Sequence, residues 1–207
     1  MFGSVLKSIG LLAIGAMIYL PLQSATEAAN TKVGYIAVGG RTLVPYGWVD
    51  FCDRYKGECD GGELPAQDVN LTPESMKIIK QVNLWANTNI KPMSDMDHWG
   101  KIDQWDYPAD GYGDCEDYAL LKRRLLIDEG MPRQALLITI VKDESNEGHA
   151  ILTIKTNKGE YMLDNLVNDV KPWTQVPYRF VKRQSQTNQN EWVEIGEPTQ
   201  APLVVSR

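Results

Sequence analysis

Three apolar, β-branched segments joined by short polar loops most constrain the fold of this chain. They span residues 135–141, 149–155 and 160–163, and the loops between them hold turn-forming Asp, Asn and Gly. Loops this short connect antiparallel neighbours, because parallel strands need a long crossover connection. The sequence therefore predicts an antiparallel meander, and residues 178–181 and 191–195 have the composition of two further strands.

The register of the second hairpin can be derived from its side-chain pairs. If Lys155 faces Glu160 across the loop, Leu152 faces Leu163, and apolar partners meet. A slip of one residue would move every side chain to the other face of the sheet. The apolar pairs therefore favour this register over its neighbours.

The same register brings together two residues whose side chains can take part in catalysis. Extending the pairing places Ile151 opposite Asp164 and His149 opposite Leu166. His149 and Asp164 then lie at diagonal positions on one face, within side-chain reach of each other.

Two helices are predicted upstream of the meander. The first begins at Thr72-Pro73-Glu74, an N-cap followed by proline at the first helical position, and continues to about Ala86. The second follows Gly113-Asp114, contains Cys115 in its first turn and ends at Gly130.

The remaining segments are rich in turn residues. Residues 33–70 are expected to form strands and loops. Residues 88–112 are expected to form an irregular aromatic segment that lines a cleft, with plain packing under a long loop as the alternative. Helices packed on an antiparallel sheet give an α+β fold class.

Residues 1–28 have the three-part layout of a secretory signal. Lys7 precedes an apolar run over residues 9–20, and small residues before Ala28 suit a signal peptidase. The run is shorter than the ~20 residues of a membrane span, although an uncleaved anchor is the alternative. We therefore expect export, with residues 29–207 as a single domain.

Charge and cysteine content narrow the function. Lys and Arg number 21 against 27 Asp and Glu, a net charge of −6 that offers no basic field for nucleic acid. In an oxidising compartment Cys52 and Cys59 form a local disulfide, since a metal clip would lack further Cys or His ligands nearby. Cys115 is then a lone thiol, and the chain has only two histidines, His98 and His149.

The lone thiol, His149 and Asp164 form the constellation of nucleophilic acyl transfer. A helix N-terminus and a nearby imidazolium both favour the thiolate of Cys115. Asp164 would orient the imidazole, and backbone N–H groups at the helix start could hold an oxyanion. The alternative is a buried free cysteine, a surface histidine and a turn-forming aspartate.

These residues also resemble a known family, the bacterial transglutaminase-like cysteine proteinases, typified by the LapG-type periplasmic adhesin protease. The similarity runs from about residue 33 to 196. It is carried by Trp99-Gly100, Asp103-Gln104-Trp105, Pro108, Gly113-Asp114-Cys115-Glu116-Asp117-Tyr118-Ala119, Lys122-Arg123, Gly148-His149-Ala150-Ile151-Leu152-Thr153 and Leu163-Asp164-Asn165.

The resemblance implies a papain-like, transglutaminase-like core and a catalytic triad of Cys115, His149 and Asp164. It also implies a calcium ion beside the nucleophile, a periplasmic location and a role in biofilm formation through cleavage of a surface adhesin. An inner-membrane cyclic-di-GMP receptor that sequesters the protease is implied as a partner. The Cys52–Cys59 loop departs from the typical pattern, which puts the substrate of this chain in doubt.

The sequence also gives a physical reason to expect a calcium site. Asp114, Glu116 and Asp117 surround the thiol with negative charge, which opposes formation of a thiolate. A hard divalent cation that takes oxygen ligands from these carboxylates would offset that charge. The alternative is that Asp114 caps the helix while Glu116 and Asp117 complement its dipole.

Three functions follow as alternatives. The first is an exported cysteine endopeptidase, a hydrolase that cleaves a protein substrate. The second is a transglutaminase-type acyl transferase, in which an amine replaces water. The third is a calcium-dependent peptide-binding module without turnover, against which an intact triad argues.

His98, in a polar loop between acids, is expected to be solvated or paired with a carboxylate.

Overall fold

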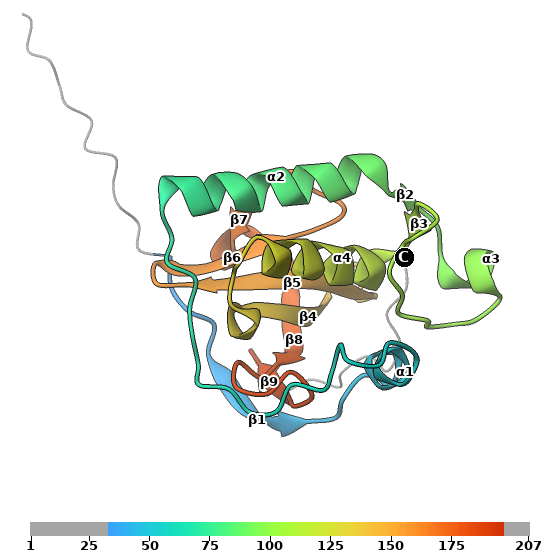
Figure 1. Ribbon diagram of the computed structural model, residues 1–207, viewed down its shortest axis with the longest axis horizontal. Coiled ribbons are helices and arrows are strands. Elements are labelled where there is room, and N and C mark those ends of the chain that lie inside the picture. The colour runs from blue at the N-terminus through green and yellow to red at the C-terminus, as the bar shows by residue number, and fades with distance from the viewer. Residues whose placement is uncertain (1–32, 197–207) are drawn as a thin grey trace, which may run out of the picture. The chain divides into compact units, whose positions relative to one another are not determined.

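The computed structural model describes residues 33–196, and the predicted secretory signal over residues 1–28 lies outside the described residues. The described chain is an α+β fold with a seven-stranded antiparallel sheet in the order β1-β9-β8-β4-β5-β6-β7 (Figure 1). Its strands are β1 (Val38–Thr42), β4 (Leu136–Lys142), β5 (Gly148–Thr156), β6 (Gly159–Leu163), β7 (Lys171–Pro172), β8 (Arg179–Gln184) and β9 (Trp192–Ile195).

The predicted meander is confirmed, and so is its register. β5 and β6 pair with Lys155 opposite Glu160 and Leu152 opposite Leu163. One detail of the prediction is wrong, because the pairing ends at Leu163 and does not extend to Asp164. Asp164 instead begins the loop that leaves the sheet.

Both predicted helices are present. α2 (Pro73–Asn89) starts with a reciprocal capping box between Thr72 and Ser75 and with proline at its first position. α4 (Cys115–Asp128) is followed by Gly130, whose φ of 84° ends the helix in the left-handed region. α4 lies against β4 and β5, and α2 packs on α4 (Figure 1).

Two shorter helices were not predicted from the sequence, α1 (Tyr46–Arg54) and α3 (Asp95–Trp99). α1 lies in the segment that was expected to contain only strands and loops. Its first residue follows Pro45, and its buried face is contributed by Trp48 and Phe51. A helix this short depends on tertiary packing rather than on propensity, so its own sequence carries only a weak signal.

The segment over residues 88–112 is also more regular than expected. It contains α3 and two short strands, β2 (Lys91–Pro92) and β3 (Tyr112–Gly113), which pair in parallel. Trp105 in this segment is fully buried and packs against Trp48 and Trp192. For Trp105 the core-packing alternative is therefore correct.

Two 3-10 helices complete the described chain, η1 (Arg133–Ala135) and η2 (Trp173–Gln175). Within residues 33–196, no helix has the length and apolar character needed to span a bilayer.

Candidate active site

Cys115 is the first residue of α4, directly after the N-cap residue Asp114. Its side chain is buried, with 1% of its surface exposed. The sulfur lies 3.3 Å from the backbone N–H of Ala150 on β5, which donates to it. The thiol therefore lies where the helix N-terminus meets the sheet, and both features favour negative charge on sulfur.

His149, the second residue of β5, is also fully buried. Its Nε2 lies 3.0 Å from Oδ1 of Asp164. The structure thus places His149 and Asp164 in contact, as predicted, although Asp164 reaches the ring from the loop after β6 and not from a paired strand position. Since Nε2 is engaged by the carboxylate, Nδ1 is the ring nitrogen left to exchange a proton with sulfur.

Asp164 is held by two further donors. The hydroxyl of Tyr178 donates to Oδ2 at 2.5 Å, and the backbone N–H of Leu166 donates to Oδ1 at 3.0 Å. Sequence reasoning missed Tyr178, because no local pattern links a residue of the loop before β8 to the end of β6. These bonds fix the orientation of the carboxylate toward His149.

The electrostatics of His149 and Asp164 match an ion pair. Burial alone would lower the pKa of His149, but the hydrogen bond with Asp164 and the neighbouring Cys115 raise it to about 9. Burial opposes ionisation of Asp164, yet the interactions with His149 and Tyr178 hold the pKa of its carboxyl below the usual value. These interactions favour the protonated imidazole together with the ionised carboxylate.

A group of buried acids lies beside the thiol. Sequence reasoning named Asp114, Glu116 and Asp117, and the structure adds Asp95 and Asp103 to them. Carboxylate oxygens of Asp95, Asp103 and Glu116 lie within 4.8 Å of one another, and so do those of Asp95, Asp114 and Asp117. Asp95 belongs to both groups and so links the five acids. We call them the acidic cluster: Asp95, Asp103, Asp114, Glu116 and Asp117.

The two added acids come from the segment that was expected to be irregular. Asp95 is the first residue of α3, and Asp103 lies in the loop that follows. The only signal in the sequence is the high density of acids over residues 95–117. The fold of this segment, rather than its composition, brings two of those acids onto the α4 N-terminus.

Burial and mutual repulsion both oppose negative charge in the acidic cluster. Burial, and then repulsion from Asp95, raise the pKa of Asp114 to about 7. Burial and repulsion from Asp114 raise the pKa of Asp117 to about 9. Burial and the neighbouring Cys115 and Asp114 raise the pKa of Glu116 well above its usual value.

The donor set fits a hard divalent cation. Among the described residues, Oδ1 of Asp114 and Oε1 of Glu116 are buried oxygens without a hydrogen-bond partner. Such oxygens are expensive to bury unless they accept a bond or bind a metal. Calcium takes six to eight oxygen ligands in flexible geometry, and each of the two overlapping groups, Asp95–Asp103–Glu116 and Asp95–Asp114–Asp117, could supply part of such a ligand shell.

The carboxylate of Asp117 also accepts hydrogen bonds from two backbone N–H groups. Its Oδ1 accepts from the backbone N–H of Asp106 at 2.6 Å, and its Oδ2 accepts from that of Asp114 at 3.3 Å. Gly113 permits this packing, because a Cβ at that position would lie 2.7 Å from the Asp117 carboxylate. Asp117 therefore also holds the start of α4 in place through the backbone N–H of the N-cap residue Asp114.

An apolar groove of about 580 Å³ opens next to the acidic cluster and shares Asp103 with it. Its apolar walls are formed by Leu43, Val44, Pro45 and Ile102. His98 does not face Cys115 as the base; its Nε2 lies 2.8 Å from Oδ2 of Asp110 and its ring stacks on Trp99. The expected carboxylate pairing of His98 is confirmed.

Comparisons with known proteins give the family and the fold of this chain. A family model described as bacterial transglutaminase-like cysteine proteinase matches residues 38–200. Calcium-bound LapG of Legionella pneumophila aligns at 22% identity with a TM-score of 0.51, covering 64% of this chain and 77% of that chain. Another LapG structure of the same organism aligns at 24% identity with a TM-score of 0.49, covering 60% and 71%. A search of the curated proteins finds no match.

The likeness to calcium-bound LapG shows the fold. The expected transglutaminase-like core, with helices on an antiparallel sheet, is thereby confirmed.

Proposed function

Because this chain belongs to the bacterial transglutaminase-like cysteine proteinases, we propose that Cys115, His149 and Asp164 are its catalytic triad. The observation that carries the proposal is the buried His149–Asp164 pair at 3.0 Å, beside a thiol at the N-terminus of α4.

In the proposed reaction, the Cys115 thiolate attacks a backbone carbonyl carbon of the protein substrate and forms a tetrahedral oxyanion. Backbone N–H groups in the first turn of α4 stabilise that oxyanion. The His149 imidazolium then gives its proton to the leaving amine as the C–N bond breaks. Water hydrolyses the resulting thioester, with His149 as the base, and releases the free thiol.

We propose calcium as the resident cation of the acidic cluster. Asp95, Asp103, Asp114 and Glu116 would hold it, with Asp117 as a further ligand or as the residue that orients Asp114. The calcium-bound state of the Legionella pneumophila protein supports this choice. When bound, the cation would offset the negative charge that opposes a thiolate at Cys115.

We further propose export to the periplasm and cleavage of a surface adhesin, under control of a cyclic-di-GMP receptor in the inner membrane. Export rests on the predicted signal over residues 1–28. The apolar groove beside Asp103 is placed to receive an apolar side chain of an extended substrate.

The first test is the rate of alkylation of Cys115 by iodoacetamide between pH 5 and 9, with calcium and with EGTA. We expect rapid reaction below pH 7 in calcium, and at least a tenfold slower reaction in EGTA or in His149→Ala. A thiol with the pH profile of free cysteine, pKa ~8.5, under all conditions would exclude the activated thiol. Cys52 and Cys59 form a disulfide, so the label reports on Cys115.

Turnover requires a second measurement. Surface proteins of the source cells are incubated with the wild-type protein or with Cys115→Ala, and new N-termini are identified by mass spectrometry. Peptidase activity predicts new N-termini with the wild-type protein and none with the variant. Binding without new N-termini would favour the calcium-dependent binding module, and isopeptide cross-links would favour the acyl transferase.

A further inference from the structure

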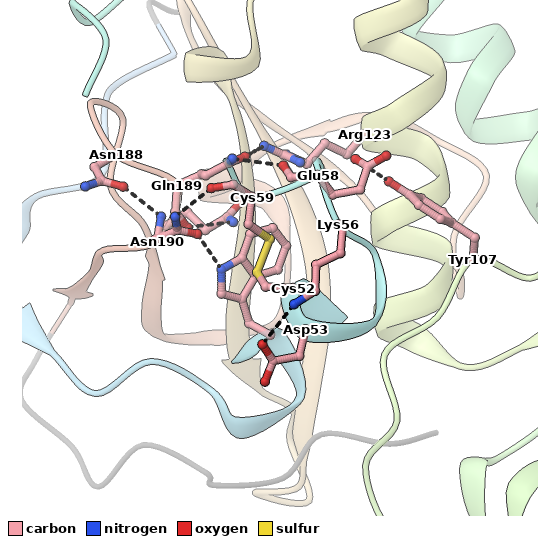
Figure 2. Close-up of a disulfide and its surroundings, with 12 residues drawn as sticks. Cys52, Asp53, Lys56, Glu58, Cys59, Tyr107, Arg123, Asn188, Gln189 and Asn190 are labelled. Atoms are coloured by element: carbon pink, nitrogen blue, oxygen red, sulfur yellow. Dashed lines mark hydrogen bonds and ion pairs between the residues drawn. A yellow bond between two sulfur atoms is a disulfide. The ribbon is translucent and has the colours of Figure 1, made fainter. Parts of the chain in front are cut away.

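The end of α1 and the loop that follows it are closed by the Cys52–Cys59 disulfide. Figure 2 shows how this loop is tied to the turn before β9. The side chain of Asn190 donates to the carbonyl of Cys59 at 2.8 Å, and that of Gln189 donates to the carbonyl of Glu58 at 3.0 Å. The disulfide loop is therefore fixed on the turn before β9 at its Glu58–Cys59 end, and the disulfide joins that end to α1.

From this fixed loop, two side chains reach the segment over residues 104–106. Arg54 donates to the carbonyl of Trp105 at 2.5 Å and to Oδ2 of Asp106 at 3.0 Å. The hydroxyl of Tyr55 donates to the other carboxylate oxygen of Asp106. The two side chains together engage both carboxylate oxygens of Asp106 and the carbonyl before it.

Segment 104–106 in turn contacts the acidic cluster through its backbone. The N–H of Asp106 donates to Asp117 at 2.6 Å, and the N–H of Gln104 donates to Asp95. The packing of Trp105 on α1 reinforces the arrangement, since a Cβ on Gly47 would lie 2.2 Å from the indole. α1 thus positions two carboxylates of the cluster through one intervening segment.

We propose that Arg54 and Tyr55 are positioning residues that set the cation affinity of the acidic cluster, and that the Cys52–Cys59 disulfide holds them in place. The inference rests on the proposed calcium site. Residues that orient metal ligands through hydrogen bonds change metal affinity by 10- to 100-fold when they are removed. The disulfide loop would then keep the site organised for calcium in an oxidising compartment.

The test is calcium titration calorimetry on the purified protein and on Arg54→Gln. We expect the Kd for calcium to rise at least tenfold in Arg54→Gln. Arg54→Lys should recover only part of the affinity, because an ammonium cannot match the forked geometry that bonds the carbonyl and the carboxylate together. The matched control is Lys56→Gln, which removes one positive charge from the same loop, where Lys56 contacts Asp53 at 3.5 Å.

Thermal unfolding in EGTA separates positioning from general stability. A merely structural role for Arg54 would lower the unfolding temperature in EGTA and leave the calcium Kd unchanged, which would overturn the inference. A double variant, Cys52→Ser with Cys59→Ser, should also raise the Kd. Unchanged affinity in this folded double variant would contradict the part assigned to the disulfide.

The outcomes also separate this inference from the proposal on which it rests. If the wild-type protein binds calcium and Arg54→Gln binds it equally well, the positioning role is wrong while the calcium site stands. If the wild-type protein shows no calcium binding, the calcium proposal and this inference are both wrong. The alkylation profile of Cys115 in His149→Ala tests the triad independently of either result.

Discussion

At the scale of single residues, Lys122 on α4 is a buried lysine with little to compensate its burial. It is 1% exposed, and within residues 33–196 its Nζ has no hydrogen-bond partner, only the face of Tyr118 at 5.6 Å from the ring centroid. Burial lowers the pKa of Lys122 to about 7, although the charge of Asp164 acts in the opposite direction. The folded state thus disfavours the ammonium that the unfolded chain carries.

We therefore expect Lys122→Met to stabilise the protein. The penalty of the buried lysine is fully present below pH 7 and disappears as pH rises above its unfolded pKa of ~10.4. The gain in free energy of unfolding should be about 1–4 kcal/mol at pH 7 and near zero at pH 11. Urea unfolding at several pH values measures it, and a loss of stability at pH 7 would show that the ammonium is paired.

At the scale of elements, α2 supports the loop that carries Asp164. The side chain of Asn83, fully buried on α2, donates to the carbonyls of Val167 at 3.1 Å and Asn168 at 2.9 Å. Asn87, one turn later, donates to the carbonyl of Asp164 at 2.9 Å. The helix thus anchors the backbone on which the triad carboxylate sits.

Asn83→Ala should lower the free energy of unfolding by about 1–3 kcal/mol, because the carbonyls of Val167 and Asn168 lose the buried donor that they share. We also expect slower alkylation of Cys115, since a displaced Asp164 orients His149 less well. The control is Asn89→Ala, whose amide bonds to Trp85 within the same helix. Equal effects of the two variants would contradict an anchoring role specific to Asn83.

At the scale of the whole molecule, the buried acids make stability depend on pH and on cation. Burial and mutual repulsion raise the pKa of Asp114 to about 7 and that of Asp117 to about 9. Their penalty is absent below the unfolded pKa of ~3.9 and grows as pH rises toward those values. The raised pKa of His149, about 9, acts in the same direction, because its stabilising effect is lost as pH rises from ~6.5 through 9.

In EGTA, the unfolding temperature should therefore fall steadily between pH 5 and pH 9. Calcium should remove most of the fall, because a ligand that binds only the folded state stabilises it by mass action. Scanning calorimetry with calcium, with magnesium and with EGTA measures the effect. A profile that calcium does not change would contradict a cation site in the acidic cluster.

The meander and the two long helices could be predicted because their signals are local. Hairpin register follows from side-chain alternation and loop length, and it places His149 and Asp164 at the same end of the hairpin, although Asp164 itself lies in the loop after β6. α1 and α3 could not be predicted in the same way. Both are short, and contacts with distant segments stabilise them.

The residues of the site were likewise predicted only in part. Acids adjacent to Cys115 in the sequence were named, since neighbours on a helix start must lie near the thiol. Asp95, Asp103 and Tyr178 were missed, because they reach the site through loops whose paths depend on long-range packing.

The sequence by itself determined an α+β fold with an antiparallel meander, the Cys52–Cys59 pairing and the placement of His149 and Asp164 at one end of a hairpin. Each of these depends on residues close in sequence or on a fixed strand period. Only the tertiary structure decided which distant acids join Asp114 and Glu116, and that Arg54 reaches the segment that holds them. The physical reason is that burial, which raises the pKa of the acids and makes them fit a cation, is a property of the packed chain.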